Sequence, residues 1–264
     1  VSISVKQYRR MLWLERRILR YADAVFSPSQ VAMDALVRDL GLLHQPAHFH
    51  VMGYGRPELT PSQDRQPQTQ KEAQRLMGMG HISEMPDTLR PIVLLAVGRL
   101  SPVKQFSRLI DIAALLETQY NLPVQLLIAG QGDALSLQQQ AQEQRLKYPP
   151  MIGFIEDVAI PFAAADFYIG TCPVESYGQA NREALAAGCV ALAPTGGGSG
   201  EVLGQGALLQ PLQADSIAER IAFLWRTPEH YQYWQQQALQ EAKRWPDWNQ
   251  IADQYENVFY TLRP

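Results

Sequence analysis

Short apolar runs alternate with longer stretches of helical periodicity along most of the chain. Apolar residues recur every three or four positions from Phe106 to Leu116, for example, which is typical of a helix with one buried side. Strands that alternate with helices of this length favour an α/β fold, in which helices flank a parallel sheet. The predicted strands are Ile92–Val97, Val124–Ala129, Met151–Phe154, Phe167–Thr171, Val190–Ala193 and a shorter one at Ala207–Leu209.

The first part of the chain shows the same alternation on a smaller scale. Ser4–Tyr21 is predicted as a helix, Ala24–Ser27 as a strand, and Ser29–Leu40 as a second helix that Ser29 caps and Gly41 ends. Another strand is predicted at His48–Met52.

The composition changes between Arg56 and Pro91, where Pro, Gln and Ser dominate and large apolar residues are few. This stretch, residues 56–91, is predicted as a linker that holds one short helical piece near Ala73–Met77.

Charge and cysteine content narrow the class of protein. The chain has 264 residues and a net charge of −3, so no overall basic field points to nucleic acid as a partner. Its two cysteines, Cys172 and Cys189, lie in apolar stretches, so we expect no disulfide framework and a reducing, cytoplasmic location. No apolar run approaches the length of a membrane span, and no secretory signal pattern is visible at the start.

Polar and glycine residues follow several predicted strands, where ligands bind in open α/β sheets. Gly98, Arg99 and Lys104 come after the first strand of the main series, and their cations suit a diphosphate, although two solvated surface cations would fit equally well. Gly130 and Gly132 follow the next strand without the third glycine of a dinucleotide-binding motif, so a tight turn with Asp133 as helix cap is favoured. A flexible glycine loop is predicted at 194–201, and it lacks the ending of an ATP-binding loop.

The most informative element is a pair of glutamates, Glu175 and Glu183, separated by seven residues. Gly178 stands between them, where a strand hands over to a helix. Such a turn directs backbone N–H groups and the positive end of a helix dipole toward one point, which suits a phosphate. Two carboxylates beside it suit neutral hydroxyls, such as those of a ribose and a sugar.

Taken in order, these motifs resemble the retaining GT-B glycosyltransferases of family four, and the resemblance covers most of the chain. It implies a Rossmann-like sheet that forms the donor-binding, C-terminal half of a GT-B fold. The implied domains are an acceptor-side remnant at 1–55, the linker at 56–91, the donor domain at 92–244 and a closing helix at 245–264 that packs back across the cleft.

The resemblance also implies a role for each motif residue. Arg99 and Lys104, after Gly98, would bind the donor diphosphate, and Glu183 the ribose hydroxyls. Glu175 would contact the sugar near the reacting carbon and is the candidate catalytic residue. The remaining donor-site residues would be the phosphate-capping turn and the contacts to the base: Tyr177, Gly178, Gln179, Ala180, Ile155 and Asp157.

We expect the substrate to be a UDP- or GDP-linked sugar, with no cofactor and no metal, since no Asp-x-Asp pair occurs. The acceptor, whether a glycan, a lipid or a small molecule, stays open. The acceptor domain of the family has only a remnant here, so the isolated chain is expected to transfer sugar slowly or not at all. Two alternatives remain: a donor-half subunit that needs a separate partner, and a nucleotide-sugar epimerase of the same fold.

The run Gln179–Arg182 departs from the more apolar sequence usual in the family, which leaves the identity of the sugar open. The first helix is strongly basic, with six cationic residues against Glu15. A helix of this kind can lie on an anionic membrane surface, but an ordinary solvated face is the favoured interpretation.

Overall fold

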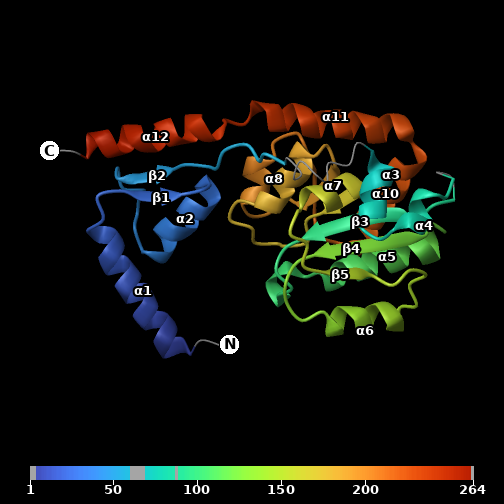
Figure 1. Cartoon of the computed structure of the whole chain (residues 1–264). Coiled ribbons are helices and arrows are strands. Elements are labelled where there is room, and N and C mark those ends of the chain that lie inside the picture. Colours follow the sequence, from blue (N-terminus) through green and yellow to red (C-terminus); the bar gives the residue numbers. More distant parts are fainter. Residues whose placement is uncertain (1–3, 60–68, 87–88, 263–264) are drawn as a thin grey trace. The chain divides into compact units, whose positions relative to one another are not determined.

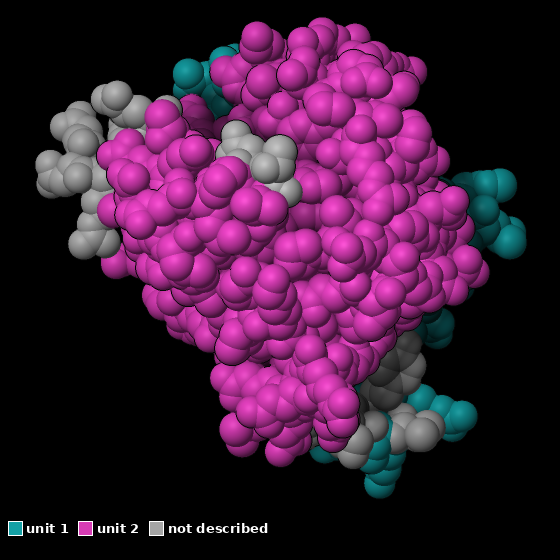
Figure 2. Space-filling model, turned by 90° about the vertical axis from the view of Figure 1, so that its right-hand side faces the viewer, with its two compact units in different colours: residues 1–55, 246–264 teal, residues 56–245 magenta. Residues whose placement is uncertain are grey.

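The computed structural model describes residues 4–59, 69–86 and 89–262. The chain divides into two compact units, coloured separately in Figure 2. Unit 1 combines Val1–Gly55 with Pro246–Pro264, and unit 2 is Arg56–Trp245.

Unit 2 is built on a six-stranded sheet in which all neighbouring strands are parallel (Figure 1). The strand order is β5-β4-β3-β6-β7-β8, so the chain reverses its winding direction between β3 and β6. This arrangement confirms the predicted α/β, Rossmann-like fold. The strands are β3 (Ile92–Val97), β4 (Val124–Ala129), β5 (Met151–Gly153), β6 (Phe167–Ile169), β7 (Val190–Pro194) and β8 (Leu208–Gln210).

Both faces of the sheet are covered by helices. Along β3, Ile92 and Leu94 belong to one buried apolar cluster and Val93 and Leu95 to another, as the period of two in a strand requires. The first cluster takes in α5 (Ser107–Gln119), α6 (Leu135–Glu143) and α10 (Ala214–Arg226). The second takes in α3 (Gln70–Leu76), α4 (Gly80–Ser83), α7 (Ala159–Ala164), α8 (Gln179–Ala186) and α11 (Pro228–Arg244).

Part of the predicted linker is folded core instead. Ala73, Met79 and Ile82, from α3 and the segment around α4, are fully buried in the second cluster. The amide of Gln70 donates to Asp166 Oδ1 at 2.9 Å, which fastens α3 to the start of β6. The helical piece predicted near Ala73–Met77 is present as α3, whereas α4 was not predicted, because a few buried residues in a polar stretch give only a weak periodic signal. Residues 60–68 and 87–88 of that stretch lie outside the described residues.

Two further elements differ from expectation. The short helix α7 was not predicted, because its residues Ala159–Ala164 are nearly all buried and show no polar face. The glycine loop predicted at 194–201 contains the start of a helix, α9 (Gly198–Val202), which follows Gly197 in a left-handed conformation with φ of +68°.

Unit 1 holds the predicted helices and strands of the first part of the chain. α1 (Val5–Arg20) starts at a capping box formed by Ser4, and α2 (Gln30–Asp39) is capped by Ser29. Between and after them, β1 (Val25–Ser27) and β2 (Phe49–Val51) form a parallel pair. The last helix, α12 (Trp248–Thr261), packs on this pair through Tyr255, whose ring lies 4.8 Å from that of Phe26. The domain roles assigned to these segments stay predictions.

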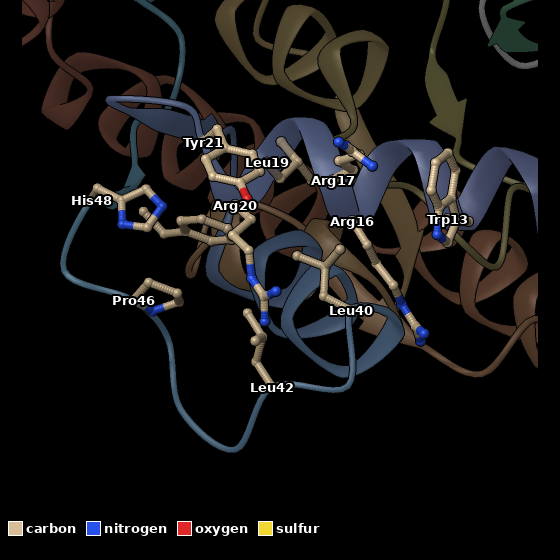
Figure 3. A pocket seen from close by; sticks show the side chains of 11 residues that line it. Trp13, Arg16, Arg17, Leu19, Arg20, Tyr21, Leu40, Leu42, Pro46 and His48 are labelled. Carbon is tan, nitrogen blue, oxygen red and sulfur yellow. The ribbon is translucent and has the colours of Figure 1, made fainter.

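A hollow in unit 1 lies between α1 and the segment before β2 and has a volume of about 690 Å³ (Figure 3). Three arginines of α1, Arg16, Arg17 and Arg20, line it together with Trp13 and His48. Within the described part of the chain, no helix combines the length and apolar character needed to cross a membrane.

Candidate functional site

The loops after β3 and β4 are tied together at the carboxyl edge of the sheet. Gly98 N donates to the carbonyl of Ala129 at 2.9 Å, and Leu100 N donates to that of Gln131 at 2.8 Å. A Cβ at Gly130 would overlap the carbonyl oxygen of Gly98, so only glycine allows the two loops to meet. The Gly130–Gly132 pair therefore serves close backbone packing, as the tight-turn interpretation predicts.

Lys104 and Glu175, two predicted donor-site residues, form an ion pair. Lys104 ends a single turn of 3-10 helix after β3, and Glu175 lies in the loop after the neighbouring strand β6. Each side chain is 22% exposed, so the pair is accessible without being fully solvated. The hydroxyl of Thr171 donates to the carbonyl of Lys104 at 2.5 Å and holds the two loops together. The cation and the carboxylate thus stand side by side at the edge where the winding reverses.

The N-terminus of α8 opens beside this pair. Gly178 precedes the helix with φ of +79°, a conformation that glycine adopts readily. The first N–H groups of the helix, from Gln179 and Ala180 onward, have no partner within the helix and point outward at the positive end of its dipole. Asn181, in the first turn of α8, lines the same small pocket as Lys104 and Glu175, so the helix that follows the predicted phosphate-capping turn reaches this pocket.

The start of α9 supports the loop that carries Glu175. Gly198 N donates to the carbonyl of Glu175 at 2.6 Å, and a Cβ at Gly198 would overlap the carbonyl oxygen of Ser176. The next residue, Ser199, is fully buried and accepts a hydrogen bond from the Asn181 amide at 2.9 Å. Asn181 lines the small pocket from the first turn of α8. The position of Glu175 is therefore fixed from two sides.

Glu175 and Glu183, the two glutamates of the paired motif, both influence the Tyr168 hydroxyl. Burial raises the pKa of the Tyr168 hydroxyl, and the charges of Glu175 and Glu183 raise it further, so both carboxylates lie near this residue of β6. Burial also raises the pKa of Glu183 itself, partly offset by the adjacent cation of Arg182. A half-buried carboxylate at a ligand-binding edge is characteristic of functional sites.

Three other predicted residues contribute less to this geometry. Arg99 is exposed at the start of the loop after β3, and Ile155 is half-buried after β5. Asp157 accepts a hydrogen bond from Ala159 N at 3.1 Å, in the turn that leads into α7. The contact of Ile155 and Asp157 with a nucleotide base stays a prediction.

Three residues of the site were not predicted as site residues: Thr171, Asn181 and Ser199. Thr171, Asn181 and Ser199 act through hydrogen bonds to residues that are distant in sequence, which periodicity does not reveal. Within the described ranges, no group of three or more His, Cys, Asp or Glu side chains is placed to hold a metal ion.

Residues 84–241 match the family model of glycosyl transferases group 1, which is more than half of the chain. The chain belongs to this glycosyltransferase family. The matched region contains β3 to β8 and therefore every residue of the site built above. The search of curated proteins finds no match.

Solved structures of similar fold include several glycosyltransferases. HepE of Anabaena, crystallised with UDP and glucose, is 20% identical with a TM-score of 0.77, and the match covers 98% of this chain and 67% of that one. Sucrose-phosphate synthase of Thermosynechococcus elongatus is 21% identical with a TM-score of 0.76, over 99% and 64%. A glycosyltransferase of Rickettsia africae is 14% identical with a TM-score of 0.73, over 99% and 68%. This glycosyltransferase chain thus spans about two thirds of the length of these neighbours.

Proposed function

We propose that this chain is the donor-binding half of a retaining, metal-independent glycosyltransferase, which moves a sugar from a nucleotide sugar to an acceptor. The observation that carries the proposal is the ion pair of Lys104 and Glu175 beside the N-terminus of α8. It combines a cation for a diphosphate, donors for its oxygens and a carboxylate for the sugar. Membership of the glycosyltransferase family and neighbours crystallised with UDP or UDP-glucose support this assignment.

The chemistry follows from where charge develops. When the bond between the anomeric carbon and the diphosphate oxygen breaks, negative charge grows on the leaving diphosphate. Lys104 and the first N–H groups of α8 stabilise that charge, with the exposed Arg99 as a second cation. Fixed cations and a helix dipole serve here in place of a metal. When Lys104 pairs with the bound diphosphate in place of Glu175, the Glu175 carboxylate becomes available to the sugar. There it stabilises positive charge at the reacting carbon.

Lys104, Glu175 and the N-terminus of α8 account for donor binding and not for acceptor binding. Because the chain spans about two thirds of its structural neighbours, we propose that the isolated chain binds donor but transfers sugar slowly or not at all. A UDP-linked sugar is the preferred donor, by analogy with the HepE complexes, and a GDP-linked sugar is the second candidate.

A labelled donor tests the reaction class. After incubation with UDP-glucose labelled in the sugar, the isolated chain is expected to return the donor almost unchanged. Conversion of the bound sugar to another isomer would support an epimerase instead. Rapid transfer to an added acceptor would contradict the proposed half-site character.

Glu183 provides a prediction that links pH, stability and binding. The pKa of Glu183 in the folded protein is raised above the ordinary value of 4.5. Its ionisation therefore lowers the free energy of unfolding as the pH rises from below 4.5 through the folded pKa. Glu183→Gln is therefore expected to raise the free energy of unfolding at pH 7 by up to about 1 kcal/mol while it weakens UDP binding roughly tenfold. Urea denaturation and calorimetric titration measure the two effects. Unchanged UDP affinity in Glu183→Gln would exclude the ribose role.

A further inference from the structure

The first turn of α8 contains a buried arginine. Arg182 is only 1% exposed and is the largest fully buried side chain among the described residues. Burying a guanidinium is costly, and a cation in the first turn of a helix also opposes the helix dipole. A hydrophobic side chain of similar volume would fill the same space at lower cost. The charge at this position therefore calls for an explanation other than packing.

Aromatic rings replace water around this charge. The guanidinium carbon lies 4.3 Å from the ring centre of Trp245 and 5.0 Å from that of Tyr177. Its Nη1 donates to the side-chain oxygen of Gln179 at 3.1 Å. Burial lowers the pKa of the Arg182 guanidinium. Because the ordinary pKa of arginine is very high, the group stays cationic at neutral pH.

The residues that contact Arg182 come from the turn at the start of α8 and from the end of unit 2. Tyr177 and Gln179 flank Gly178 and so frame the turn that starts α8, the helix whose Asn181 lines the small pocket. Trp245 follows α11 and is the last residue of unit 2. Through Arg182, the phosphate-capping turn is fastened to the end of unit 2, and a permanent positive charge lies behind the N-terminus of α8.

We propose that Arg182 is a positioning residue for the donor diphosphate. It holds the turn from Tyr177 to Gln179 in the conformation that presents N–H groups to phosphate. When the diphosphate binds nearby, its negative charge offsets the free-energy cost of burying the Arg182 cation, because charges interact strongly in a region of low dielectric. This inference rests on the proposed function and names a residue of the same site that the family motif does not include.

The test compares a charged ligand with its uncharged counterpart. UDP and uridine are titrated by calorimetry or ligand-observed NMR against the wild-type chain, Arg182→Met and Arg182→Lys. Arg226→Met is the control for loss of an exposed arginine, because Arg226, at the end of α10, also lies over a tyrosine ring, Tyr120, and donates to the carbonyl of that residue at 2.7 Å. Circular dichroism establishes that each variant is folded.

Arg182→Met is expected to weaken UDP binding about tenfold and to leave uridine binding within about twofold. Arg182→Lys, which keeps the charge, is expected to recover part of the loss, and Arg226→Met to change neither ligand. If Arg182→Met does not fold, Arg182→Gln takes its place in the comparison with Arg182→Lys. Equal losses for UDP and uridine, or no loss for UDP, would overturn the positioning role. A wild-type chain that binds no nucleoside diphosphate would refute the proposed function instead.

Discussion

Replacing Lys104 by methionine is expected to weaken UDP binding about a hundredfold. The substitution removes the cation assigned to the diphosphate and leaves the Glu175 carboxylate, its ion-pair partner, facing the bound phosphates. Loss of attraction and gain of repulsion act in the same direction, and together they are worth about 3 kcal/mol in a half-buried site. Calorimetric titration with UDP measures the change.

A double substitution separates charge from packing. Lys104→Met combined with Glu175→Gln removes the repulsion, so it is expected to bind UDP about tenfold more tightly than Lys104→Met alone. Lys147→Met serves as the control, because Lys147 is exposed and precedes β5, near the amino ends of the strands and not at their carboxyl ends. If Lys104→Met binds UDP as the wild type does, the diphosphate lies elsewhere.

Gly198→Ala is expected to destabilise unit 2 by about 2 kcal/mol, even though alanine is the better helix former. The helix preference of alanine over glycine is worth about 1 kcal/mol. Against it stands the overlap of a Cβ with the Ser176 carbonyl oxygen, a backbone atom that moves only if the Glu175 loop moves. Overpacking against backbone costs up to about 3 kcal/mol, so the clash decides the sign. Urea denaturation measures the free energy of unfolding.

Gly153→Ala is the control for this substitution. Gly153 lies in β5, and a Cβ there would meet no atom within 4 Å. Its replacement is expected to leave stability unchanged or to raise it by up to about 1 kcal/mol, because alanine restricts the unfolded chain. Equal stability of Gly198→Ala and wild type would show that the Glu175 loop is not held by α9.

The strands and most helices of unit 2 could be predicted, because buried parallel strands and one-sided helices leave strong periodic signals. β3 and β4 begin and end at the predicted residues. α7 could not be predicted, since a helix buried on nearly all sides has no polar face. α3 was predicted as a short helical piece, but α4 was not, because a polar stretch with few buried apolar residues, among them Met79 and Ile82, gives a weak periodic signal.

The candidate site was predictable where topology alone brings residues together. Lys104 and Glu175 were both predicted to follow strands of one sheet, and the observed order places β3 beside β6, which brings the two residues into contact across 71 positions of sequence. Their roles in donor binding stay predictions. The contacts of Asn181 with Ser199 and of Arg182 with Trp245 depend on side-chain packing between helices and loops. No spacing in the sequence encodes such contacts.

Donor binding is the central claim, and a calorimetric titration tests it most directly. The wild-type chain is titrated with UDP, GDP and ADP without added metal, then with the matching nucleotide sugars. One nucleoside diphosphate, with UDP expected, should bind with a dissociation constant in the micromolar range, about −8 kcal/mol. The Lys104→Met variant should bind that diphosphate about a hundredfold more weakly. Absence of binding by all three diphosphates to the folded wild-type chain would contradict the donor-site assignment.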